Sequence, residues 1–283
     1  MDKNALKGAD ALNYPRVLTI QDISCAGQCS MPVALPILSA CGVETCVLPT
    51  AVLSTHTGGF GRPHICDLTD EMPHIAAHWK QAGLDFNVIS CGYLSSSAQM
   101  AHVSAIFGGL AAPGCITVID PAMADHGKLY AGFDHSFVEA MKKFCGKADY
   151  LLPNITEACL LTGTEYKTEY DRGWIESLLE KLAALGCKQI VLTGVSFDEN
   201  TTGVMVNGTY ICHERLSQSC HGTGDIFAAA FAGALAKGKG GVQAARIAAE
   251  YTLSCMKLTL AENTRPYGVM FEPLLGELAE QLK

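Results

Sequence analysis

Clusters of basic residues are missing from this sequence. It has no block of lysine and arginine and no basic stripe interleaved with aromatic residues, and its formal net charge is −8. A protein that follows a phosphate backbone needs such positive charge, so we expect no nucleic-acid partner. Because the overall field repels anions, a phosphorylated ligand would have to be held locally, by a metal ion or by helix N-termini.

Cysteines with metal-binding or redox spacing are also missing. The 13 cysteines lie between Cys25 and Cys255, without a CxxC pair or the cysteine and histidine spacing of a zinc site. The opening segment, MDKNALKGADALNYP, is polar and has no apolar stretch of the kind found in signal peptides. We therefore expect reduced, mostly buried thiols and a cytoplasmic protein.

Long apolar runs are absent too. The runs at 33–40 and 226–236 are too short to span a bilayer, so we expect no membrane segment. The P-loop pattern GxxxxGK[ST] does not occur, and GTGDIF fails the dinucleotide-binding GxGxxG pattern because Phe227 takes the place of the third glycine. A composition of 49% hydrophobic and 17% charged residues still predicts a chain that folds around a large core.

The sequence does contain an alternation of short β-branched runs and amphipathic segments. This order predicts an α/β fold in which helices cover both faces of a mostly parallel sheet, giving three layers, α/β/α. One amphipathic segment, 174–186, is predicted to be a helix that ends at Gly186. The predicted strands are 16–20, 43–49, 86–90, 115–120, 148–153 and 188–194.

The pattern changes after Gly194. Residues 201–214 are typical of two strands around an Asn207-Gly208 turn, which predicts an antiparallel edge to the sheet, and two alanine-rich helices follow. No linker or repeat divides the chain. We therefore predict one domain over residues 16–283, preceded by a flexible tail at 1–15.

The segment GTGD opens the first alanine-rich helix. Gly222 and Gly224 allow backbone conformations that turn successive N–H groups toward one point, and the helix dipole adds positive charge there, so Gly222, Thr223 and Gly224 are predicted to bind an anion. Asp225 follows in the first turn. It could simply complement the dipole, or it could accept the proton of a substrate hydroxyl during phosphoryl transfer. We expect the dipole to lower its pKa.

Other polar residues follow the predicted strands, where ligands bind in open parallel sheets. For Asn154 and Glu157 a structural interpretation competes, because the pair has the spacing of a helix capping box. The residues at the strand ends are Asp22, residues 50–59, Tyr93, Asp120, Asn154–Glu157 and Thr193.

Several of these segments resemble a known family. HGTGDIFAAAFAGAL resembles the C-terminal signature of ribokinase-like small-molecule kinases. RVLTIQD, LPTAVLSTHTGGFG, CGYLSS, DPAMADHGKLY and LLPNITEACLLTG are similar to successive motifs of pyridoxal kinases, in the same order, from about residue 16 to residue 235. The resemblance implies ATP-dependent phosphorylation of the 5-hydroxymethyl group of pyridoxamine, pyridoxal or pyridoxine to the 5′-phosphate, in vitamin B6 salvage.

The same resemblance implies roles for individual residues. Asp225 would be the catalytic base, with Gly222, Thr223 and Gly224 as the anion hole. ATP would contact Asp120, Asn154, Glu157 and Thr193, with Mg²⁺ near Asp120 and Glu157. Oxygen ligands of this kind suit Mg²⁺, which keeps most of its waters. The substrate ring would contact Thr57 and Tyr93, with His56 nearby in a flap at 54–61. A monovalent cation and a homodimer are further expectations from the family.

The chain departs from the family at Asp22, where pyridoxal kinases usually carry serine. A carboxylate there could pair with the aminomethyl cation of pyridoxamine, so we hypothesise that pyridoxamine is favoured. ISCAGQCSM partly resembles hydroxymethylpyrimidine kinases of thiamine synthesis, although many of those carry cysteine where this chain has Asp225. That activity and a non-catalytic ligand-binding relative remain alternatives. Cys29 and Cys220 lie near the predicted site, and we interpret both as inert thiols.

Overall fold

The computed structural model describes residues 14–218, 220–262 and 267–283. Most of the expected N-terminal tail, residues 1–13, lies outside the described residues. At the end of that expected tail, the Pro15 carbonyl already accepts a hydrogen bond from the Glu44 amide at 3.0 Å. No helix within the described ranges is long and apolar enough to cross a membrane.

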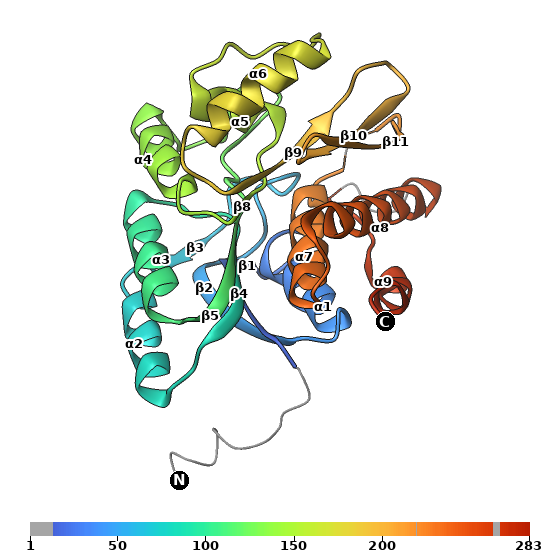
Figure 1. The fold of residues 1–283 in the computed structure, drawn as a ribbon. Helices are drawn as coiled ribbons and strands as arrows, with labels where there is room; N and C mark the ends of the chain where they lie inside the picture. The colour runs from blue at the N-terminus through green and yellow to red at the C-terminus, as the bar shows by residue number, and fades with distance from the viewer. Residues whose placement is uncertain (1–13, 219, 263–266) are drawn as a thin grey trace.

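A mostly parallel sheet runs through the centre of the molecule (Figure 1). Its strand order is β11-β10-β9-β8-β5-β4-β1-β2-β3, and the five pairings from β2 to β9 are parallel. The strands of this sheet are β1 (Arg16–Ser24), β2 (Glu44–Leu53), β3 (Ile65–Asp67), β4 (Phe86–Cys91), β5 (Ala111–Ile119), β8 (Tyr150–Leu151), β9 (Gln189–Val195), β10 (Thr201–Val206) and β11 (Thr209–Glu214). A separate small hairpin pairs β6 (Ala124–Asp125) with β7 (Lys128–Leu129).

Helices cover both faces of the sheet, so the predicted three-layer α/β/α class is confirmed. α1, α7, α8 and α9 pack on one face, and α2 to α6 pack on the other (Figure 1). The helices are α1 (Met31–Ala40), α2 (Met72–Ala82), α3 (Ser97–Gly109), α4 (His135–Cys145), α5 (Ile155–Thr162), α6 (Arg172–Ala183), α7 (Thr223–Ala236), α8 (Gly241–Glu262) and α9 (Leu275–Gln281), with a 3₁₀ turn at Glu272–Leu274.

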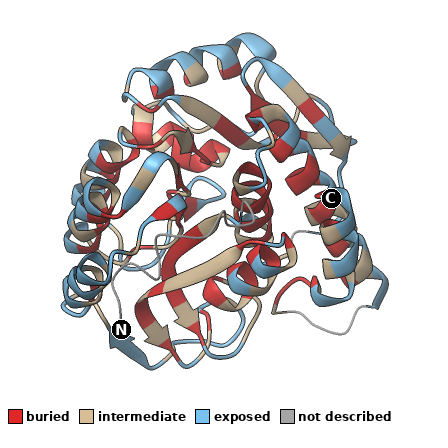
Figure 2. Cartoon of the chain, turned by 60° about the horizontal axis from the view of Figure 1, so that its bottom comes forward, coloured by how far each residue is buried: buried red, intermediate tan, exposed pale blue. Residues whose placement is uncertain are grey.

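The pleat of the strands divides the core between the two faces. In β1, Val17 joins the core beneath α1 and α7, whereas Leu18 and Ile20 join the core beneath α2 to α6. β9 repeats this division with Val191 and Leu192. Figure 2 shows the result, with buried residues along the sheet and the inner sides of the helices and exposed residues on their outer sides. This two-sided burial explains the near-continuous apolar runs of the central strands.

The predicted hairpin is confirmed, with Asn207 and Gly208 both at positive φ, 49° and 75°, between β10 and β11. The opposite edge was not predicted: β3 pairs antiparallel with β2 there. The predicted end of the helix at Gly186 is wrong, because α6 already ends at Ala183. Strand β1 runs further than predicted, to Ser24, so Asp22 lies inside a strand, and Thr193 lies inside β9, as it did in the predicted strand 188–194.

Candidate active site

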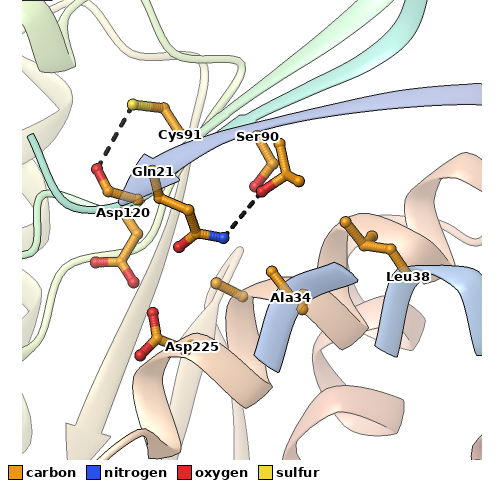
Figure 3. A pocket seen from close by; sticks show the side chains of 11 residues that line it. Gln21, Ala34, Leu38, Ser90, Cys91, Asp120 and Asp225 are labelled. Carbon is orange, nitrogen blue, oxygen red and sulfur yellow. Dashed lines mark hydrogen bonds between the residues drawn. The ribbon is translucent and has the colours of Figure 1, made fainter. Parts of the chain in front are cut away.

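The carboxyl ends of the central strands and the start of α7 bring two predicted acids together. Asp120 directly follows β5, and Asp225 lies in the first turn of α7. Both line one pocket, which Gln21 and Cys91 also line, and their carboxylates point toward each other (Figure 3). Burial raises the pKa of Asp120 well above its ordinary value, and the negative charges of Glu157 and Asp225 raise it further. The carboxyl groups of Asp120, Glu157 and Asp225 are therefore close enough for each charge to disfavour the ionisation of Asp120.

The start of α7 has the geometry that the glycines predicted. Gly222 is the N-cap with φ 87°, and the first helical hydrogen bond runs from the Ile226 amide to the Gly222 carbonyl at 3.1 Å. The amides of the turn before it have no partner within the helix. A Cβ on Gly222 would lie 2.0 Å from the Gln28 carbonyl oxygen, and one on Gly224 would lie 3.9 Å from Asp120 Oδ2. The predicted anion-binding turn therefore adjoins Asp120.

The expected lowering of the Asp225 pKa is wrong. Burial is the largest influence and raises the pKa to about 7, although the backbone amide of Ser30 lowers it and the charge of Asp22 raises it. The dipole of α7 is too weak to offset the loss of hydration, since a helix N-terminus contributes about 0.3–2 kcal/mol to a charged group. Asp225 is therefore a stronger base than an ordinary aspartate.

Asn154 and Glu157 form the capping box of α5, as the structural interpretation predicted. The Asn154 side chain accepts from the Glu157 amide at 2.9 Å, and Glu157 Oε2 accepts from the Asn154 amide at 2.9 Å. Glu157 Oε1 accepts from the Met123 amide at 3.0 Å, which ties the segment after Asp120 to α5. Burial nevertheless raises the pKa of Glu157 to about 7. The cap and a role in the site are thus compatible.

The predicted magnesium ligands are two carboxylates, of which Glu157 is buried and Asp120 is partly buried. Outside the gaps at 1–13, 219 and 263–266, no group of three or more His, Cys, Asp or Glu side chains is arranged to hold a metal ion. Asp120 and Glu157 still fit Mg²⁺, because both offer carboxylate oxygen atoms as ligands. The raised pKa of Asp120 comes in part from neighbouring negative charge, which a bound cation would neutralise. An ion held this way would keep waters or take phosphate oxygens in its other positions.

Thr193 lies next to this capping box. It forms an isolated parallel bridge with Asn154, and its hydroxyl donates to the Pro153 carbonyl at 3.3 Å. The next residue, Gly194, has a φ of 73° and lies at an irregularity where the pairing of β9 with β10 skips one residue. Asn154 and Thr193 are therefore brought together, as an ATP contact would require, and their contact with nucleotide stays a prediction.

Asp22 lies near enough to Asp225 for their charges to interact, at an irregularity of β1 where the register with β2 shifts between Gln21 and Ile23. Its side chain is 3% exposed, and the Ser24 hydroxyl donates to Oδ2 at 2.9 Å. Burial raises the pKa of Asp22, while the hydroxyls of Ser30 and Ser24 lower it.

Tyr93, which follows β4, lies near enough for the charge of Asp22 to raise the pKa of the half-buried phenol, together with the larger effect of burial. Its ring lies beside that of Phe133, with 5.7 Å between centroids. The structure thus brings together Asp22 and Tyr93, two of the predicted substrate residues.

The flap at 54–61 is anchored through His56. Its Nδ1 accepts from the Gly58 amide at 3.0 Å, so its Nε2 carries the proton and donates to the Tyr267 carbonyl at 2.7 Å. Burial lowers the pKa of His56, which keeps the ring neutral. Both ring nitrogens are thus used within the protein. Thr57, the other predicted flap contact, is exposed, and its contact with substrate stays a prediction.

The two cysteines near the site have the properties of unreactive thiols. Burial raises the pKa of Cys29, and the charges of Asp225 and Asp22 raise it further. Burial also raises the pKa of Cys220. A higher pKa leaves less thiolate, the nucleophilic form, at neutral pH.

Sequence reasoning missed the supporting residues Ser30, Tyr267 and His221. Ser30 precedes α1 with φ 58° and contacts both Asp22 and Asp225. A serine directly before Met-Pro is a helix-start signal that could have drawn attention to it. Tyr267 lies 211 positions from His56, so no local pattern could have paired them. His221 directly precedes the GTGD segment, and that position was the available signal.

Comparison with known proteins identifies kinases of two related kinds. A family model described as phosphomethylpyrimidine kinase matches residues 35–269. The chain is also similar to a pyridoxal kinase of Dictyostelium discoideum, with 29% identity over 209 residues that cover 70% of this chain and 65% of the relative. That match spans slightly less than two thirds of the relative's length.

Two solved structures cover nearly all of the chain. The pyridoxal kinase from Lactobacillus plantarum is 33% identical, with 94% of this chain and 97% of that chain covered and a TM-score of 0.86. A structure from Bacteroides thetaiotaomicron, provisionally called a phosphomethylpyrimidine kinase and solved in a crystal form with pyridoxal, is 33% identical, with 94% and 96% covered and a TM-score of 0.87.

Proposed function

This chain belongs to the phosphomethylpyrimidine kinase family, with a ribokinase-like fold, and we propose that it is a vitamin B6 kinase. It transfers the γ-phosphoryl group of ATP to the 5-hydroxymethyl group of pyridoxamine, pyridoxal or pyridoxine. The observation that carries this proposal is the position of Asp225, a base of raised pKa at the start of α7, opposite Asp120. A proton acceptor and an anion-binding turn at one point are what phosphoryl transfer to an alcohol needs.

The reaction depends first on Asp225. Its carboxylate accepts the proton of the substrate hydroxyl as the oxygen attacks the γ-phosphorus, and the bond from that phosphorus to the β–γ bridging oxygen breaks. A base whose pKa is about 7 is available at neutral pH and holds the proton better than an ordinary aspartate. The amides of the Gly222–Gly224 turn donate to the oxygens of the transferred group and stabilise its charge.

Asp120 and Glu157 complete the phosphate side of the site. These residues would hold Mg²⁺, which when bound neutralises charge on the ATP phosphates. Asn154 and Thr193 lie where they can orient the nucleotide, because both adjoin Glu157 or its helix cap. The proposed kinase domain is residues 16–283. A homodimer and a monovalent cation stay predictions from the family, and a cytoplasmic location stays a prediction from the cysteine pattern and the polar opening segment.

The position of Asp22 supports pyridoxamine as the preferred substrate. Its buried carboxylate lies near Asp225, Tyr93 and Cys29, and in each case its charge raises the pKa of the neighbour. A bound aminomethyl cation would relieve this accumulation of negative charge, whereas the aldehyde of pyridoxal offers no positive charge. We therefore expect pyridoxamine to be the preferred B6 form.

A second candidate is hydroxymethylpyrimidine or phosphomethylpyrimidine kinase activity, which the description of the matching family model favours. The test is ADP release with Mg-ATP and each of pyridoxamine, pyridoxal, pyridoxine and hydroxymethylpyrimidine. Turnover of a B6 form above the pyrimidine supports the proposal, and the reverse order supports the second candidate. Tight binding of a B6 form without ADP release would indicate a non-catalytic relative.

A further inference from the structure

His221 lies between the flap and the anion-binding turn. A Cβ on Gly58 of the flap would lie 3.1 Å from both Cε1 and Nδ1 of His221 and 3.2 Å from its Cγ. These nearly equal distances to three ring atoms place the face of the imidazole against the Cα of Gly58. The φ of Gly58 is outside the left-handed region, so the backbone there would accept other residues. His221 is exposed, and its ring would have to shift by a few tenths of an ångström to admit a side chain at position 58.

The turn that carries His221 is held in place by close packing. His221 is followed by Gly222, where a Cβ would lie 2.0 Å from the Gln28 carbonyl oxygen. Gln28 in turn bridges to Gly268, and its side-chain amide donates to Glu272 Oε1 at 2.6 Å. The His221 ring is therefore attached to a turn that packs closely against neighbouring backbone.

The flap side of the contact is fixed as well. The Gly58 amide donates to His56 Nδ1, and His56 Nε2 donates to the Tyr267 carbonyl. The rings of His56 and His221 lie 6.0 Å apart between centroids, so Gly58 is held between two histidines. Movement of the flap at Gly58 must therefore displace either the His56 hydrogen bond or the His221 ring.

We propose that His221 is a positioning residue that seats the flap on the anion-binding turn, so that enclosure of the substrate ring and alignment of the Gly222–Gly224 amides occur together. The proposal rests on the proposed kinase function for its catalytic consequence. It assigns His221 no proton transfer, because the ring acts through its packing face.

A double-mutant cycle tests the contact. The added methyl group of Gly58→Ala must push the ring aside, and His221→Ala removes the ring, so each change is expected to raise the KM for the B6 substrate about fivefold and the KM for ATP less than about twofold. The double variant is expected to be no worse than His221→Ala, because the methyl group then meets nothing. Effects that multiply in the double variant would overturn the proposal.

His221→Phe separates packing from chemistry. A phenyl ring keeps a flat face against Gly58 and has no titrating nitrogen, so the KM is expected to stay within about twofold of the wild type. If His221→Phe instead raises the KM as much as His221→Ala does, the flat packing face is not what matters and the positioning role is wrong.

Hydrogen exchange of the flap makes the test independent of turnover. In the ligand-free protein, flap peptides over 54–64 are expected to exchange about tenfold faster in His221→Ala than in the wild type or His221→Phe. Unchanged exchange would overturn the contact even in an active enzyme. Failure of every B6 form as a substrate, with the exchange difference present, would overturn the proposed function and leave the seating of the flap standing.

Discussion

The two halves of the site are built in different ways. On the phosphate side, Glu157 is held by the backbone amides of Asn154 and Met123, so main-chain hydrogen bonds fix the position of its carboxylate. On the proposed ring side, the His56 amide makes a longer main-chain hydrogen bond, to the Ala26 carbonyl at 3.2 Å, and the flap is otherwise held through the His56 ring and the packing face of His221. Elements held by few contacts open at lower free-energy cost than elements tied into the main chain. The comparison indicates that the proposed phosphate side is fixed and that the proposed ring side can adjust.

The largest expected effect lies at the junction of the two halves. Asp225→Ala removes the proposed proton acceptor, and we expect kcat to fall about 10³-fold, within the range for general bases. ATP affinity should change by less than about twofold, because the phosphate side keeps its own contacts. ADP release and ATP titration measure the two quantities. Asp70→Ala is the matched control, since Asp70 is an exposed acid just before α2, and near-normal turnover by Asp225→Ala would refute the assignment.

The raised pKa of Asp225 predicts how stability depends on pH. Its folded pKa of about 7 exceeds the ordinary 3.8, so the folded state binds the proton more tightly than the unfolded chain does. The contribution is complete below pH 3.8 and is lost as the pH rises through 7. Partial exposure of the residue reduces the loss to about 2–3 kcal/mol of unfolding free energy.

Urea unfolding of the metal-free protein at several pH values measures this loss. Asp225→Asn, which cannot ionise, should lose less stability between pH 4 and pH 8 than the wild type does. Equal pH slopes for the two proteins would show that burial does not raise this pKa.

Substitutions of Glu157 and Asn154 test whether main-chain hydrogen bonds fix the proposed phosphate side of the site. Glu157→Ala leaves the amides of Asn154 and Met123 without their acceptor, and we expect a loss of about 2 kcal/mol of unfolding free energy. Asn154→Ser keeps an N-cap acceptor for α5 and should cost less than about 1 kcal/mol. Thermal or chemical unfolding compares the two variants. If they prove equally stable, the phosphate side is not held by the hydrogen bonds described here.

The smallest expected effect concerns the proposed ring side of the site. Asp22→Ser removes the carboxylate proposed to pair with the aminomethyl cation, and the ratio of kcat/KM for pyridoxamine to that for pyridoxal should fall about tenfold. Asp22→Asn is the matched control for side-chain size and should lower the ratio similarly. A ratio that stays constant in both variants would eliminate the preference for pyridoxamine.

Much of the fold could be predicted from local patterns. The strands around Asp120 and the turn at Asn207-Gly208 follow from β-branched runs and from turn chemistry, which depend on neighbours in the chain. The edge strand β3 could not be predicted, because its three residues are exposed and carry no periodic pattern. The end of α6 was misplaced because Gly186, at φ 103°, belongs to the turn that follows the helix.

The site divides in the same way. The motif that contains Asp225 could be found in the sequence, and the assignment of the chain to its kinase family is confirmed by the family model. The direction of the pKa shift of Asp225 could not be predicted from the sequence, since desolvation depends on what the fold packs around a carboxylate. The hydrogen bond between His56 and Tyr267 could not be predicted either, because the two residues lie 211 positions apart in the chain.

The sequence by itself therefore determined the order of strands and helices, the identity of the acids at the strand ends and the anion-binding turn, because these depend on residue type and local spacing. Only the tertiary structure decided that Asp225 has a raised pKa, that Glu157 also accepts from the Met123 amide, and that His221 lies against Gly58. Burial, hydration and contact are properties of segments brought together by folding, and no local stretch of the chain contains them.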